Sequence, residues 1–196
     1  MTGRALIGLI AAAALAVAAT PASSATRFGS KLTPTTQPAN AGRGILCRQN
    51  SPSTMCTAVM TIARNRPPSA TQAPKDGTIA KLRLIACYPG TFVLQIARLN
   101  RVLKRARVTR TGPLINYRGD RKHCTGETFE IEEFRVNVPV KKGDALAVLA
   151  TKIGFLYSAG DNGSLAFDPP LADGQPVREA FDEGTGIILL EAEYDD

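Results

Sequence analysis

The stretch FEIEEFRVNV, residues 129–138, alternates apolar and polar side chains from Phe134 to Val138. A period of two is typical of a strand with one buried and one solvated face. The stretch TIAKLRLIA, residues 78–86, alternates in the same way after the turn signal Asp76-Gly77. Frequent turn residues separate short runs of this kind along the rest of the chain. The pattern predicts an all-β, mostly antiparallel sandwich of about eight to ten strands.

Three further runs fit the same expectation, because residues 91–99, 145–150 and 186–194 each read as a strand. The segment Leu99–Val108 also places apolar residues at the spacing of a helix face. We interpret this segment as a hairpin turn followed by a strand. Near the C-terminus, Val177–Glu183 is expected to form one helical turn at most.

Four short motifs recur in a known group of proteins. They are APKDGTIAKLR at 73–83, VPVKKGD at 138–144, PLADG at 170–174 and LLEAE at 189–193. In these motifs the chain resembles a group of uncharacterised exported actinobacterial jelly-roll-like β-sandwich proteins, over residues 73–194. Leu82 stands where that group often has Trp. The resemblance implies a jelly-roll-like sandwich and carries no catalytic or ligand residues.

The N-terminus has the layout of a secretory signal peptide. Arg4 precedes an uncharged, mostly apolar run, and small residues follow Pro21. We expect residues 1–25 to be a cleaved signal peptide, with an uncleaved anchor as the alternative. Residues 26–42 read as a flexible lead-in, and residues 43–196 as a single β-sandwich domain. The protein is therefore expected to be secreted or to lie in the cell envelope.

The four cysteines of the 196-residue chain all follow this segment. An even number of cysteines in an exported chain favours disulfides, and four allow three pairings. We favour Cys47–Cys56 and Cys87–Cys124. A zinc site is the rival interpretation. It is disfavoured because the chain has no C-x-x-C and only one histidine, His123.

Charge is distributed unevenly along a chain whose net charge is +7. A basic cluster between residues 98 and 122 contains nine cations: Arg98, Arg101, Lys104, Arg105, Arg107, Arg110, Arg118, Arg121 and Lys122. Such a cluster can attract an anionic envelope polymer. The competing interpretation is neutralisation by the acidic C-terminal part, which includes Glu179, Asp182, Glu183, Glu191, Glu193 and Asp195. Nucleic acid is not expected as a partner, because no recognition motif is present.

Support for catalysis is weak. The sequence has no G-x-S-x-G motif, and His123 stands beside Cys124 in a polar loop. Oxygen-bearing residues at 161–164 with Asp168 could hold Ca²⁺, but a plain turn is the favoured interpretation. No cofactor and no metal are expected. We therefore expect a non-catalytic binding or structural module. The alternative is a hydrolase of unrecognised type that uses the surface carboxylates Glu130 and Glu132.

Overall fold

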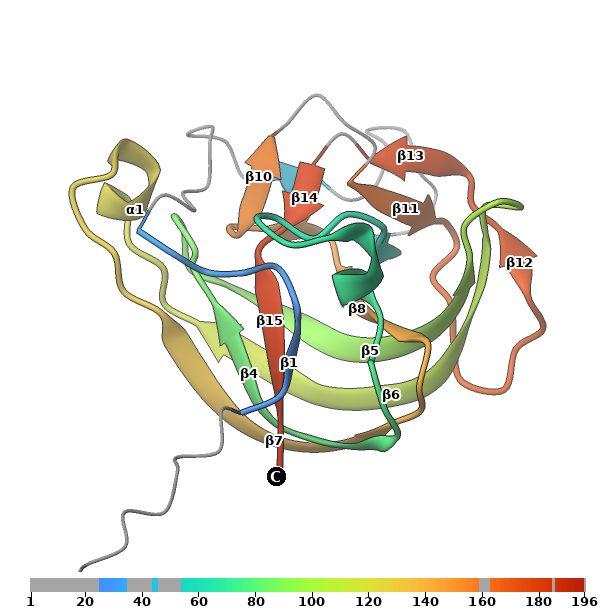
Figure 1. Ribbon diagram of the computed structural model, residues 1–196. Coiled ribbons are helices and arrows are strands. Elements are labelled where there is room, and N and C mark those ends of the chain that lie inside the picture. The colour runs from blue at the N-terminus through green and yellow to red at the C-terminus, as the bar shows by residue number, and fades with distance from the viewer. Residues whose placement is uncertain (1–24, 35–43, 46–53, 159–162, 185, 196) are drawn as a thin grey trace, which may run out of the picture.

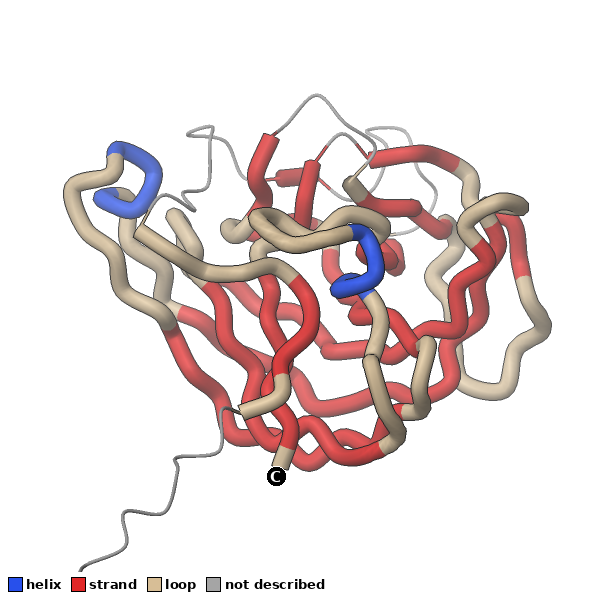
Figure 2. Tube along the Cα trace, in the orientation of Figure 1, coloured by secondary structure: helices blue, strands red, loops and turns tan. Residues whose placement is uncertain are grey.

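The computed structural model describes residues 25–34, 44–45, 54–158, 163–184 and 186–195 (Figure 1). Residues 1–24 of the expected signal peptide, residues 35–42 of the expected lead-in and Cys47 lie outside these ranges. The regular secondary structure of the described chain is almost all strand, with one 3₁₀ helix, η1 (Pro68–Thr71), and one short α-helix, α1 (Lys122–Thr125) (Figure 2). The prediction of an all-β antiparallel fold is confirmed.

The larger sheet has seven antiparallel strands in the order β12-β6-β5-β8-β3-β11-β13. Their bounds are β3 Cys56–Met60, β5 Gly90–Asn100, β6 Arg105–Tyr117, β8 Asp144–Ala150, β11 Ser164–Phe167, β12 Arg178–Glu179 and β13 Asp182–Gly184. β5 turns directly into β6, so the predicted hairpin over residues 99–108 is confirmed. Residues 177–183, for which we expect one helical turn at most, instead contain β12 and the start of β13.

The smaller sheet has four strands in the order β1-β15-β4-β7. Their bounds are β1 Arg27–Gly29, β4 Gly77–Leu84, β7 Glu132–Val140 and β15 Leu190–Tyr194. Two two-stranded pairs complete the fold: β2 (Gly44–Ile45) with β9 (Lys152–Ile153), and β10 (Leu156–Ser158) with β14 (Gly186–Ile188). β7 is an edge strand, which accommodates Pro139 because proline has no N–H to donate to a further strand.

The main core lies between the two sheets. Leu82 of β4 and Ala192 of β15 face Leu94 of β5 and Leu146 of β8 in one buried cluster. A second cluster covers the opposite face of the larger sheet and contains Ala97, Ala145, Ala147, Val59, Phe167 and Leu171. The central strand β8 is therefore buried on both faces. This explains why its sequence is a continuous apolar run rather than an alternation.

The two sheets approach each other where β6 and β7 lie side by side, and Figure 1 shows both strands curving around the core. Gly112 of β6 makes this approach possible. A β-carbon at Gly112 would lie 3.1 Å from the Val138 side chain and 3.3 Å from the Leu94 carbonyl. The sandwich is therefore curled into a half-barrel on this side.

The expected flexible lead-in is wrong for its first residues. β1 pairs with β15, and Arg27 lies opposite Glu193. Phe28 is 1% exposed, and Leu32 is also buried. These isolated apolar residues anchor the segment, although the sequence around them is polar and has no periodicity. Burial of one phenylalanine contributes about 2 kcal/mol, enough to hold a short edge strand in place.

The predicted disulfide Cys87–Cys124 is confirmed, with 5.6 Å between the Cα atoms. It joins the end of the β4 segment to α1 and closes a loop of 37 residues. On the chain-entropy estimate, a loop of this length contributes about 4 kcal/mol. The other predicted pair includes Cys47 and lies outside the described residues.

Candidate functional site

The basic cluster divides into three groups in the folded protein. The first lies at the tip of the β5–β6 hairpin. There Lys104 forms an ion pair with Glu183, and Arg105 lies 3.3 Å from Glu179. Arg101 is partly buried, which lowers its pKa, and it donates hydrogen bonds to Pro68 and Thr71 of η1. These three cations serve the fold of the hairpin.

The second group surrounds α1. Arg118 lies 3.8 Å from Glu132, and the Arg121 guanidinium lies 5.4 Å from the centre of the Tyr88 ring. Arg121 and Lys122 are both exposed at the start of α1. Arg118 lines a pocket with His123 and Glu132, and no cation of the first group lines that pocket.

The third group forms the candidate site. Arg98, Arg107 and Arg110 line one pocket of about 660 Å³. We call it the basic pocket, and its complete lining is Asp76, Arg98, Arg107, Thr109, Arg110, Pro139, Val140, Lys141 and Asp144. Strands β5, β6 and β8 of the larger sheet supply one wall. The end of β7 and the β7–β8 turn supply the other, so the pocket opens where the two sheets meet.

The faces of the strands explain why three arginines share this pocket. Arg98 lies directly opposite Arg107 on β6 and opposite Asp144 on β8. Arg98 has the same parity along β5 as the core residues Leu94 and Ile96. Its side chain therefore lies on the inner face of the larger sheet, just beyond the apolar core.

A β-bulge adds Arg110 to this face. Ile96 pairs with Arg110, whereas Ala97 pairs with Val108, so Thr109 is the extra residue. The Thr109 hydroxyl donates to the Ile96 carbonyl over 3.2 Å. In a regular strand, residues 107 and 110 would point to opposite faces. The bulge restores them to the same face, which is a common use of such insertions.

The carboxylates that line the pocket are already engaged. Asp144 is 3% exposed, and one of its oxygens lies 2.7 Å from the Arg98 guanidinium. Its other oxygen accepts a hydrogen bond from the Lys141 backbone N–H over 2.8 Å. Asp76 accepts a hydrogen bond from the Lys142 N–H over 2.6 Å. Both carboxylates therefore hold the β7–β8 turn in place.

The β7–β8 turn also places Lys141 at the pocket, a residue that sequence reasoning missed. The Asp144 N–H donates to the Lys141 carbonyl over 2.9 Å, which closes a four-residue turn. Gly143 occupies its third position with a φ of +84°, a conformation that glycine adopts without strain. The resemblance carried by the motif at 138–144 implies no ligand residue, yet the turn brings Lys141 into the same pocket lining as Arg107 and Arg110.

Within the described residues, Arg107, Arg110 and Lys141 have no ion pair. The pocket lining holds two more cations than carboxylates. The lining therefore carries an excess of positive charge, and all four of its cations are exposed to solvent, where they can attract an anion.

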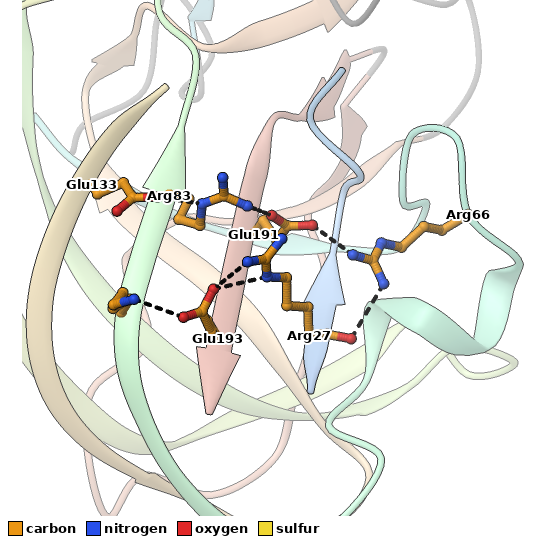
Figure 3. A network of polar contacts seen from close by, with 7 residues as sticks. Arg27, Arg66, Arg83, Glu133, Glu191 and Glu193 are labelled. Carbon is orange, nitrogen blue, oxygen red and sulfur yellow. Dashed lines mark hydrogen bonds and ion pairs between the residues drawn. The ribbon is translucent and has the colours of Figure 1, made fainter. Parts of the chain in front are cut away.

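The acidic C-terminal part neutralises other cations. Glu191 and Glu193 lie next to each other on the outer face of β15, as Figure 3 shows. Glu191 is 2% exposed and forms ion pairs with Arg83 and Arg66, both at 2.5 Å. Glu193 pairs with Lys81 and Arg27. None of these partners belongs to the cluster at 98–122.

The electrostatics of this network are visible at Glu193. The hydrogen bond from Lys81 is the main cause that lowers the pKa of Glu193, and Arg27 lowers it further, while burial acts in the opposite direction. The network joins β1, β15 and β4 and reaches Glu133 of β7 through Arg83. It is a structural feature of the smaller sheet, and among the described residues the neutralisation hypothesis holds only for Lys104 and Arg105.

Of the residues considered for catalysis, Glu132 and His123 are engaged with the backbone, whereas Glu130 is exposed. Both carboxylate oxygens of Glu132 accept backbone N–H groups, from Arg118 over 2.9 Å and from Gly119 over 2.8 Å. The His123 ring is 3% exposed, and its Nδ1 lies 2.8 Å from the Ala86 carbonyl. Its Nε2 accepts the Glu130 N–H over 3.3 Å. These residues line a pocket of about 250 Å³ in which the ring already has two backbone partners.

The possible calcium segment falls partly on residues 161 and 162, which lie outside the described residues. The described residues contain no cluster of three or more His, Cys, Asp or Glu side chains able to hold a metal ion. The helices they contain are too short to span a bilayer.

Comparisons with known proteins identify no relatives. No protein family, no curated protein and no solved structure matches the chain. The class of protein that the fold defines is an antiparallel β-sandwich with a basic pocket where its two sheets meet. The resemblance to exported actinobacterial sandwich proteins stays a prediction.

Proposed function

We propose that the protein is a non-catalytic module, secreted or held in the cell envelope, that contacts an anionic polymer through the basic pocket. The observation that carries this proposal is the convergence of Arg107, Arg110 and Lys141 on one pocket without ion-pair partners among the described residues. Unpaired cations gathered on one pocket repel one another, and an anion relieves that repulsion.

Export is supported by two independent features. Residues 1–25 have the basic, apolar and small-residue regions of a signal peptide. The Cys87–Cys124 disulfide is of the kind that persists in oxidising compartments. An envelope location would place the protein among polymers that carry phosphate, carboxylate or sulfate groups, which are the natural counterions of such a pocket.

The strength of the interaction is expected to depend on salt. Each cation that pairs with a polymer charge releases a condensed counterion, so the affinity falls steeply as the salt concentration rises. The remaining exposed cations near α1 add long-range attraction, which salt screens over about 10 Å at 0.1 M. The pocket therefore sets where the polymer is held, and the surrounding charge assists its approach.

Cosedimentation of the purified protein with the envelope fraction of its host, across a salt series, tests the proposal. We expect binding that falls steeply with salt and that is weakened by Arg107→Glu with Arg110→Glu. The absence of binding, or binding that is indifferent to salt and to this pair of changes, would overturn the proposal.

A further inference from the structure

We infer that the basic pocket is selective for a phosphomonoester, the doubly charged phosphate carried at one point on a small alcohol or sugar unit. This inference rests on the proposed function and specifies the anion. Three properties of the pocket support it: the number of its unpaired donors, its balance of charge and its volume.

The donors come from two directions. Arg107 and Arg110 reach the pocket from β6, and Lys141 reaches it from the end of β7. A planar carboxylate has two oxygens, which one guanidinium fork can satisfy. A phosphomonoester has three terminal oxygens in a tetrahedral arrangement. It can therefore accept hydrogen bonds from two guanidinium groups and one ammonium group at once, whereas a carboxylate would leave cations without a partner.

The charge balance favours a dianion. Arg98, Arg107, Arg110 and Lys141 face Asp76 and Asp144, which leaves two positive charges in excess. A phosphomonoester carries a charge of about −2 at neutral pH, so it neutralises this excess. Phosphodiesters, sulfate esters and carboxylates carry a single negative charge and would leave one positive charge uncompensated in a partly enclosed site.

The volume leaves room for more than the phosphate. A pocket of about 660 Å³ lies in the range of small-molecule sites, roughly 300–1,000 Å³. Pro139 and Val140 form an apolar part of the lining. The group that carries the phosphate is therefore expected to be compact, such as a polyol or one sugar, and to contact this apolar wall.

Calorimetric titration with three probes that share a three-carbon, glycerol-like unit tests the inference. The probes are glycerol 3-phosphate (a monoester dianion), glycerophosphoglycerol (a larger diester monoanion) and glycerate (a smaller carboxylate). We expect glycerol 3-phosphate to bind at least about tenfold more tightly than either monoanion, the ratio that one charge-assisted hydrogen bond provides. Arg107→Ala with Arg110→Ala should abolish this binding, and Arg121→Ala with Lys122→Ala should leave it unchanged.

Equal binding of all three probes, or binding that persists in the Arg107→Ala, Arg110→Ala protein, overturns the inference. So does an affinity weaker than about 10 mM for glycerol 3-phosphate. The single change Arg110→Gln serves as a second variant whose fold is checked by thermal unfolding. If a polymer binds through the pocket while the probes are not distinguished, the proposed function stands and the phosphomonoester inference fails. If neither polymer nor probe binds, both fail.

Discussion

Arg98 and Arg107 lie directly opposite each other on neighbouring strands, and only Arg98 has a carboxylate partner. Two cations in this position destabilise a sheet, since like charges on directly opposed residues repel. The arrangement makes little contribution to the fold. It is the kind of local conflict between stability and charge that is expected at a binding site.

The first prediction concerns this conflict. Arg107→Gln should raise the free energy of unfolding by about 0.5 kcal/mol, because it removes repulsion and breaks no ion pair. The same change should weaken the binding of an anionic polymer. Thermal unfolding and a binding titration of one preparation measure both effects. A loss of stability would show that Arg107 supports the fold.

A second prediction concerns the hydrogen bonds that hold the segment at Leu171 against the second core cluster. Thr57 donates to Gln95 over 2.8 Å, Gln95 donates to the Leu171 carbonyl over 3.0 Å, and the Leu171 N–H donates to Thr57. All three bonds are buried, so Thr57→Val leaves groups of Gln95 and Leu171 without partners. We expect a loss of about 1–3 kcal/mol in unfolding free energy.

Chemical denaturation measures this loss. Thr78→Val is the matched control, because Thr78 is only partly buried and no side-chain hydrogen bond is found for it among the described residues. Equal stability of the Thr57→Val protein and the unchanged protein would contradict the claim that these three buried hydrogen bonds stabilise the fold.

The third prediction is a pH dependence. Because the native state lowers the pKa of Glu193, the ionised carboxylate stabilises the fold above its unfolded pKa of about 4.3. This contribution is lost as the pH falls through the lower, folded pKa. Glu193→Gln should therefore cost about 1 kcal/mol at neutral pH, and the difference from the unchanged protein should shrink in acid. Unfolding free energies measured across this range check it, and a difference that is constant with pH would contradict it.

A fourth prediction separates the two functional hypotheses. Glu132 accepts two loop N–H groups, so Glu132→Gln should lower the stability of the loop after β6 by about 1 kcal/mol and leave polymer binding intact. Hydrolysis assays with glycan and ester substrates are the readout for catalysis. Turnover that disappears in Glu132→Gln, with Glu133→Gln as control, would establish the hydrolase instead of the binding module.

The strands could be predicted because a strand with one buried face has alternating apolar and polar residues, as at residues 129–138. β1 could not, because its position depends on one phenylalanine. Phe28 is buried in the main core, where its ring lies 5.8 Å from the ring of Tyr194 on β15. A single apolar residue in a polar stretch has no period that could reveal such a contact.

The candidate site was predicted only in part, for a similar reason. The density of cations between residues 98 and 122 was plain, but which of them share a face depends on the bulge at Thr109. That bulge is a property of pairing with β5. Lys141 is distant in sequence and joins the pocket only because β7 lies beside β6. Neither the bulge nor the position of β7 beside β6 can be predicted from the local sequence pattern.

The most direct test of the central claim compares two double charge reversals on the binding of linear polyphosphate. Arg107→Glu with Arg110→Glu and Arg121→Glu with Lys122→Glu change the net charge equally, but only the first pair lines the basic pocket. The account predicts a loss of at least about tenfold in affinity for the first pair and a much smaller loss for the second. Equal losses would show that net charge alone attracts the polymer, and would contradict the claim that the pocket holds it.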